Sequence, residues 1–291
     1  MPAVRANAID LWVEDTHPGD RSRPPVLLIM GLGAQLVFWP EALVERLVAD
    51  GFRVVRFDNR DVGKSAWLDG LGRPDIAKAV RWRLLGRPLP PPYTLDDLAA
   101  DAVALLQVLD LPPTHVVGAS MGGMIAQLVA LQAPARVASL TSVMSHTGEL
   151  SHLAIHPAVA RALLAPPPRT PEAGVQALVD TFRAIGTQPF REAEFRPLAE
   201  QVIARGFHPD GTRRQLAAVL AASPRTAALG GLRLPATVIH GTADRLVPLR
   251  GGRATAAAIP GARMVEVPGI AHDLPRVAWP AIADELRRFI S

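Results

Sequence analysis

The sequence has no cysteine in its 291 residues, which excludes disulfide bonds, thiolate metal ligands and a thiol nucleophile. Aromatic residues make up only 5%, with a single tyrosine, and lysine is almost absent among the 31 basic residues. The arginines occur in scattered ones and twos without interleaved aromatic residues, which argues against nucleic-acid binding. The N-terminus lacks the apolar segment of a secretory signal, so we expect a cytoplasmic protein.

Long hydrophobic runs are also scarce. The stretch 114–135 contains no charged residue and is long enough to raise the question of a membrane span. It contains glycines, glutamines, a serine and a histidine, which fit a buried strand, turn and helix better. We therefore expect no membrane partner, and a chain with 49% hydrophobic residues and 20% charged residues is typical of a globular protein.

Short apolar runs alternate with helical patterns along most of the chain. The runs at 26–30, 115–117 and 236–240 are mostly apolar or β-branched, as in strands covered on both faces. Helical spacing of apolar residues occurs between them, for example at 41–50 and 96–109. This alternation predicts an α/β fold, with a mostly parallel sheet flanked by helices.

The alternation breaks between residues 145 and 230, where proline-rich loops and helical patterns occur without strands. Within this region, 175–185 carries one apolar stripe at helical spacing. We predict a helical cap at 145–230 inserted into one α/β core, whose two parts are 1–144 and 231–291. The alternative is a separate helical domain with no part in the site.

A serine stands at a sharp corner of the predicted fold. The sequence Gly118-Ala-Ser120-Met-Gly122 matches G-x-S-x-G, with a strand pattern before it and a helical pattern after it. Side chains two residues before and after the serine would crowd such a turn, and glycine removes them. Ser120 is therefore the candidate nucleophile.

A serine hydroxyl needs a base to take its proton, and the base needs an acid to orient it. Among the eight histidines, His272 lies between the last predicted strand and the last helix, where a loop can reach over the sheet edge. Asp244 follows the preceding strand and is the candidate acid, with Asp273 as the alternative. Histidine and carboxylate spacing of a metal site, such as H-E-x-x-H, does not occur, and we expect no metal.

An oxyanion that forms beside Ser120 needs backbone N–H donors. One donor is the amide of Met121, directly after the serine. The sequence Gly31-Leu32-Gly33 follows the first apolar strand, so its loop should lie beside the serine corner, and its glycines allow close approach of the backbone. We predict that the amide of Leu32 is the second donor.

Taken together, these motifs resemble the α/β-hydrolase superfamily, and they are most similar to the branch of small serine esterases that includes aclacinomycin methylesterase. The resemblance is carried by Met-Gly-Leu-Gly33, Phe57-Asp-Asn-Arg-Asp-Val-Gly-Lys-Ser65, Pro92-Tyr-Thr-Leu-Asp-Asp-Leu98, Gly118-Ala-Ser-Met-Gly-Gly123, His240-Gly-Thr-Ala-Asp244 and Gly269-Ile-Ala-His272. Ser120, Asp244 and His272 also occur in the chain order of that superfamily. Its dehalogenases and epoxide hydrolases carry aspartate where this chain has Ser120.

The resemblance implies an α/β-hydrolase fold with a helical cap, and a cofactor-independent carboxylic ester hydrolase that forms an acyl-enzyme. The same triad in relatives cleaves other bonds, so a C–C bond hydrolase, a lactonase or a perhydrolase remains an alternative. A receptor that has lost turnover is a further alternative, although such proteins usually lose a member of the triad.

The apolar character of the loops and of the cap predicts a pocket for small to medium hydrophobic esters. Its candidate residues include His146, which directly follows a strand. The sequence does not decide between a monomer and a homodimer. The candidate pocket residues are Gly31, Gly33, Phe38, Trp39, Met124, His146, Phe182 and Ile185.

Overall fold

The computed structural model describes residues 3–149 and 165–290. Within these residues, one eight-stranded sheet runs through the molecule in the order β1-β2-β4-β3-β5-β6-β7-β8. Strands β1 and β2 pair antiparallel with each other, β2 pairs antiparallel with β4, and the remaining neighbours are parallel. The strands span Ala3–Ala6 (β1), Ile9–Asp15 (β2), Pro25–Ile29 (β3), Arg53–Phe57 (β4), Thr114–Ala119 (β5), Val137–Val143 (β6), Ala236–Gly241 (β7) and Arg263–Val267 (β8).

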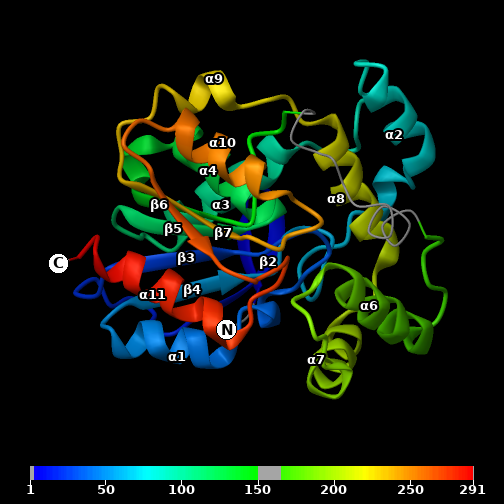
Figure 1. The fold of residues 1–291 in the computed structure, drawn as a ribbon, viewed down its shortest axis with the longest axis horizontal. Coiled ribbons are helices and arrows are strands. Elements are labelled where there is room, and N and C mark those ends of the chain that lie inside the picture. The colour runs from blue at the N-terminus through cyan, green and yellow to red at the C-terminus, as the bar shows by residue number, and fades with distance from the viewer. Residues whose placement is uncertain (1–2, 150–164, 291) are drawn as a thin grey trace.

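Helices cover both faces of the sheet (Figure 1). Helices α3, α4 and α10 lie on one face, and α1 and α11 lie on the other. The central strands β3, β4 and β5 are buried along their whole length, which explains their apolar sequences. The core helices span Glu41–Ala49 (α1), Leu95–Val108 (α3), Met121–Gln132 (α4), Thr226–Leu229 (α9), Leu249–Ala258 (α10) and Trp279–Arg287 (α11).

A group of helices stands to one side of the sheet (Figure 1). Three of them follow β6 and precede β7, inside the stretch expected to form a cap. A fourth, α2, comes from the segment between β4 and β5 and packs against α8. These helices span Ile76–Leu84 (α2), Pro171–Ile185 (α6), Glu192–Arg205 (α7) and Pro209–Ala221 (α8). Part of the predicted cap, 150–164, lies outside the described residues.

This topology agrees with the α/β-hydrolase fold expected from the motifs. Sequence analysis did not identify β1, β2 or α2. The first two are antiparallel strands at one edge of the sheet, and their residues are only partly buried. Helix α2 has exposed leucines near its C-terminal end, so it lacks a clean amphipathic pattern. No helix in the described part of the chain has the length and apolarity that a membrane span requires.

Candidate active site

Ser120 sits at the corner between β5 and α4, in a backbone conformation that is rare for a residue with a side chain. Its φ is 57° and its ψ is −121°. The turn is tight on both sides, because a Cβ at Gly118 would lie 2.0 Å from the Gly122 carbonyl oxygen. A Cβ at Gly122 would lie 2.1 Å from the carbonyl oxygen of Ile29 in β3. Glycine is therefore required at both positions for the corner to form.

His272 and Asp244 lie in line with the serine hydroxyl. The Nε2 atom of His272 is 2.9 Å from the Oγ of Ser120, and its Nδ1 is 2.7 Å from Oδ2 of Asp244. The other carboxylate oxygen of Asp244, Oδ1, accepts hydrogen bonds from the amides of Leu246 and Val247 at 2.9 and 2.8 Å. The backbone thus holds the carboxylate so that Oδ2 faces the imidazole.

Asp244 is buried, and its side chain is fully shielded from solvent. Burial alone raises the pKa of a carboxyl group, but His272 and His240 beside Asp244 lower it more, and its pKa is well below the usual value. The Nε2 of His240 lies 3.5 Å from Oδ2 and 2.8 Å from the Val247 carbonyl oxygen. Asp244 is therefore ionised at neutral pH and can hold the Nδ1–H tautomer of His272.

Asp273, the alternative acid, has other partners. Its carboxylate accepts hydrogen bonds from the backbone amide and the hydroxyl of Thr187 at 2.9 and 2.5 Å. Thr187 follows α6, so this contact joins the segment after α6 to the loop that carries His272. The structure places Asp244, and not Asp273, against the imidazole Nδ1.

The loop after β3 runs beside the serine. A Cβ at Gly31 would lie only 3.1 Å from the Cβ of Ser120. The Gly33 amide donates to Oε1 of Gln215 in α8 at 2.8 Å, which fixes the loop, while the amide of Leu32 has no acceptor among the described residues. Met121 is the first residue of α4, where backbone N–H groups have no partner inside the helix. Both predicted oxyanion donors thus belong to backbone segments next to Ser120.

A cavity of about 820 Å³ opens above Ser120 and His272. Its walls come from the loop after β3 and from α2, α6, α7 and α8, and they are mainly apolar. The rings of Phe38 and Phe182 stack in its wall, with centroids 5.4 Å apart. The sequence-predicted residues that line the cavity are Gly31, Leu32, Gly33, Phe38, Ser120, Phe182, Ile185 and His272.

Three predicted pocket residues are not part of this lining. Trp39 is fully buried in the core cluster around α1, and Met124 packs in the cluster around α3 and α4. His146 is buried, and its Nδ1 accepts a hydrogen bond from the Gly148 amide at 2.9 Å. Its position directly after β6 led us to expect it in the pocket wall, but its ring is hydrogen-bonded to the turn that follows the strand.

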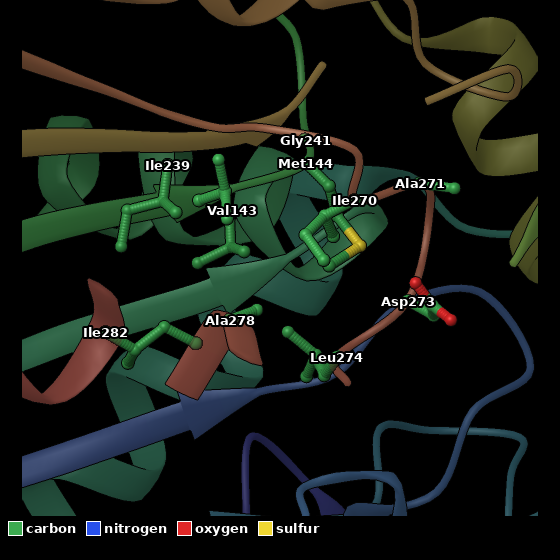
Figure 2. Close-up of a pocket in the computed structure, with 11 residues that line it drawn as sticks. Val143, Met144, Ile239, Gly241, Ile270, Ala271, Asp273, Leu274, Ala278 and Ile282 are labelled. Carbon is green, nitrogen blue, oxygen red and sulfur yellow. The ribbon is translucent and has the colours of Figure 1, made fainter. Parts of the chain in front are cut away.

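The loop that carries His272 rests on the ends of β6 and β7 (Figure 2). A small apolar cavity of about 10 Å³ lies under it, near the lower limit of the space that one water molecule occupies. Met144 and Ile270 are among its lining residues, and Leu274 closes one side (Figure 2). The loop is therefore supported from below by side-chain packing.

Comparison with known proteins identifies the family. The alpha/beta hydrolase fold family matches residues 24–275. This chain belongs to the alpha/beta hydrolase family. Rhodomycin D methylesterase DnrP of Streptomyces peucetius is 31% identical over 94% of this chain and 92% of its own length. The resemblance to this branch of esterases, inferred from the motifs, is confirmed.

Solved structures show the same fold over the whole chain. A bromoperoxidase from Bacillus anthracis superposes with a TM-score of 0.75, at 22% identity, and covers 100% of this chain and 99% of its own. A thermophilic esterase from Thermogutta terrifontis superposes with a TM-score of 0.72, also at 22% identity, over 99% and 98% of the two chains. At this identity the likeness concerns the fold alone.

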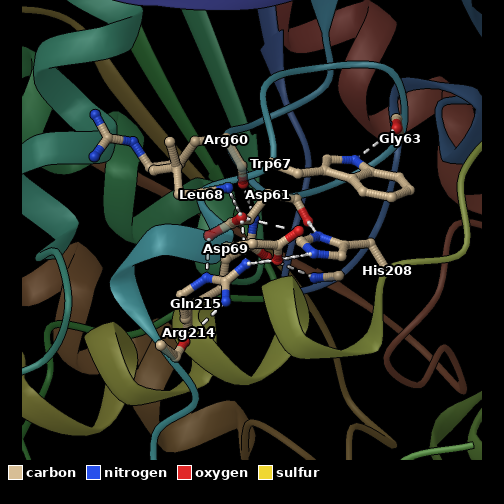
Figure 3. A network of polar contacts seen from close by, with 11 residues as sticks. Arg60, Asp61, Gly63, Trp67, Leu68, Asp69, His208, Arg214 and Gln215 are labelled. Carbon is tan, nitrogen blue, oxygen red and sulfur yellow. Dashed lines mark hydrogen bonds and ion pairs between the residues drawn. The ribbon is translucent and has the colours of Figure 1, made fainter.

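A polar network that sequence analysis missed joins α8 and the residue before it to the loop after β4 (Figure 3). Arg214 of α8 binds both carboxylate oxygens of Asp61 at 2.8 Å, and both side chains are buried. His208 lies 2.8 Å from Asp69 and stacks on Trp67 with ring centroids 4.2 Å apart. The partners are about 140 to 150 residues apart in sequence, and no local pattern signals such pairs.

The buried carboxylate of this network is paired with a guanidinium group. Burial raises the pKa of Asp61, but the Arg214 guanidinium offsets this, and the pKa lies below its usual value. Because Gln215, next in α8, binds Gly33 and the Arg60 carbonyl oxygen, α8 holds both the loop after β3 and the loop after β4.

In the described part of the chain, no cluster of three or more histidines and carboxylates could hold a metal ion.

Proposed function

We propose that this alpha/beta hydrolase is a carboxylic ester hydrolase with Ser120 as nucleophile, His272 as base and Asp244 as the orienting acid. The observation that carries the proposal is the continuous hydrogen-bonded line from Asp244 through His272 to the Ser120 hydroxyl, with contacts of 2.7 and 2.9 Å. Such a line is the geometry that activates a serine for acyl transfer.

The reaction has two halves. The Oγ of Ser120 attacks the ester carbonyl carbon while Nε2 of His272 takes the hydroxyl proton, and the amides of Leu32 and Met121 stabilise the oxyanion. Collapse of the tetrahedral intermediate breaks the ester C–O bond, and His272 returns the proton to the leaving alcohol. Water then attacks the acyl-enzyme, His272 takes its proton, and the acid is released as Ser120 regains its hydrogen.

The substrate class follows from the cavity and the relatives. A cavity of about 820 Å³ is in the upper part of the usual range for small-molecule sites, and its walls are mostly apolar. The similarity to a rhodomycin D methylesterase over 94% of this chain supports an ester of a small alcohol. We therefore propose hydrophobic carboxylic esters of a small alcohol, with an acyl group that occupies the space between α2, α6, α7 and α8.

A panel of methyl and p-nitrophenyl esters, run on the wild type and on Ser120→Ala, tests the proposal. We expect the wild type to hydrolyse hydrophobic esters of a small alcohol, and Ser120→Ala to lower kcat by about 10⁶. Labelling by a fluorophosphonate probe should also disappear in this variant. Activity of Ser120→Ala close to that of the wild type would refute the proposed nucleophile. Wild-type activity on C–C bonds next to a ketone, with none on esters, would favour the alternative reaction.

A further inference from the structure

Among the described residues that line the cavity there is one arginine, Arg213, and the mechanism above has no use for it. Arg213 lies in the first half of α8 and is half-buried at the cavity. Its Nη2 donates to the carbonyl oxygen of Pro74 at 3.1 Å, just before α2 begins. The side chain therefore lies where the α8 and α2 walls of the cavity meet.

The remaining N–H donors of Arg213 have no acceptor among the described residues. Its Nε is buried without a hydrogen-bond partner, and no carboxylate in the described part of the chain lies within ion-pair distance. Residues 150–164, outside the described part, contain no aspartate or glutamate in their sequence. A buried donor without an acceptor costs folding free energy, and an arginine offers five N–H donors in a planar fork.

Arg213 differs from two neighbouring arginines, which have carboxylate partners. The next residue, Arg214, is paired with Asp61, and Arg205 at the end of α7 is paired with Asp58. The described carboxylates that line the same cavity have other hydrogen-bond or ion-pair partners, and none of them forms an ion pair with Arg213. Asp75 accepts from the Lys78 amide, Asp180 pairs with Arg183, and Asp273 accepts from Thr187.

The position of Arg213 relative to the reacting atoms follows from the loop after β3. Thr212, the residue before Arg213, lies so close to Gly33 that a Cβ at Gly33 would be 2.9 Å from its side chain. Gly31, beside Ser120, is two residues away from Gly33, so their Cα atoms are separated by at most about 7 Å. An acyl group attached to Ser120 thus needs only a moderate length to extend along this loop to α8.

We propose that Arg213 is a substrate-binding residue that takes an oxygen acceptor, a carbonyl or a carboxylate oxygen, at the end of the acyl group remote from the ester. This inference rests on the proposed function, because it places the acyl group in the cavity. Purely apolar esters still fit the remaining walls. An acceptor at the correct distance from the ester gives the free N–H donors of Arg213 a hydrogen-bond partner. Arg213 thereby favours substrates that carry such an acceptor.

Three series of methyl esters that differ only at the far end of the acyl chain test the proposal. The chains contain six to twelve carbons and end in a methyl group, a methyl ketone or a carboxylate. Within each enzyme, the methyl-terminated ester is the reference, and the measured quantity is the ratio of kcat/KM values. The wild type should show a chain length at which a ketone or a carboxylate is favoured over the methyl group.

Arg213→Met should reduce this ratio by about 2- to 13-fold for the ketone and by about 10- to 150-fold for the carboxylate, the ranges for neutral and charged hydrogen bonds. Arg213→Lys keeps the positive charge but loses the planar fork of N–H donors, so its ratios should lie between those of the wild type and those of Arg213→Met. The two arms identify the source of the acceptor by which ratio changes more. Arg73→Met is the matched control, because Arg73 is exposed, pairs with Asp210 and does not line the cavity.

Unchanged ratios in Arg213→Met, or an equal loss on all three series, would overturn the proposal and leave Arg213 as a tie to Pro74. Binding of the same esters to Ser120→Ala, with and without Arg213→Met, gives a second readout by calorimetry that requires no turnover. Failure of the proposed function looks different, because the wild type would then hydrolyse none of the esters and Ser120 would not react with a fluorophosphonate. Arg213→Lys and melting temperatures separate loss of recognition from loss of folding.

Discussion

Replacing Asp244 by asparagine should invert the hydrogen bond that orients His272. In the native protein the Leu246 and Val247 amides donate to Oδ1, and the imidazole Nδ1 faces Oδ2. In Asp244→Asn the amide oxygen must stay at the Oδ1 position, because an NH₂ group there would face two N–H donors. The NH₂ group then points at Nδ1 of His272, which has to become the acceptor.

The consequence is a histidine with its proton on the wrong nitrogen. With Nδ1 as acceptor, the neutral ring carries its hydrogen on Nε2, which then donates to the Ser120 hydroxyl and cannot take its proton. The volume of the side chain hardly changes, so the fold should persist. From the loss seen when a triad carboxylate becomes an amide, we expect kcat to fall by about 10⁴, or about 5 kcal/mol of transition-state stabilisation.

The assay is hydrolysis of a short-chain p-nitrophenyl ester across pH, together with the rate at which a fluorophosphonate labels Ser120. Both rates should fall together, because both depend on the same proton transfer. Asp273→Asn is the control, since this carboxylate is next to His272 in sequence but binds Thr187, and its kcat should stay within about one order of magnitude of the wild type. An Asp244→Asn enzyme within tenfold of the wild type would refute the orientation argument.

Three further changes probe the turn around Ser120, the buried ion pair of Arg214 and the buried His115. Gly122→Ala should lower the free energy of unfolding by about 1–3 kcal/mol and kcat by about 10²-fold, because the new Cβ would lie 2.1 Å from the Ile29 carbonyl oxygen. Chemical denaturation measures the first quantity, and ester hydrolysis kinetics measure the second. Arg214→Met should cost about 3–5 kcal/mol in urea unfolding, because it leaves Asp61 buried and unpaired, and the double variant with Asp61→Leu should recover part of it. Burial lowers the pKa of His115 to about 4. Because the unfolded chain then binds a proton more readily than the folded one, the free energy of unfolding should fall by about 2 kcal/mol from pH 7 to pH 5 through this residue. His115→Gln should remove this part of the pH dependence. A wild-type and a His115→Gln curve with the same pH dependence would contradict this assignment.

The parts of the molecule that could be predicted from the sequence are those whose structure depends on residues close to them in the chain. The turn around Ser120 is made by glycines at fixed distances along the sequence, and its clashes are with the adjacent strand and helix. Strand β3 is apolar throughout because helices cover both of its faces. The position of His272 followed from its place between the last strand and the last helix, a property of chain order.

The parts that sequence reasoning missed depend on contacts between distant segments. Arg213 and Arg214 are adjacent and look alike in the sequence, yet one lines the cavity and the other pairs with Asp61 across 153 residues. Helix α2 contributes Ile76 and Val80 to the cavity, although its segment precedes the predicted cap by about 60 residues. Local periodicity carries no information about which of two neighbouring arginines finds a carboxylate.

The C-terminal end of α6 lines the cavity and also holds the loop that carries His272. The His272 amide donates to the carbonyl oxygen of Ile185 at 3.0 Å, and the Ala271 amide donates to the Thr187 hydroxyl at 3.0 Å. Ile185 also lines the cavity, as does Phe182 one turn earlier in α6. An acyl group that presses on this end of α6 therefore acts on the same backbone that positions His272. Substrate fit and alignment of the base are joined through one helix end, so changes to the α6 wall should alter kcat as well as KM.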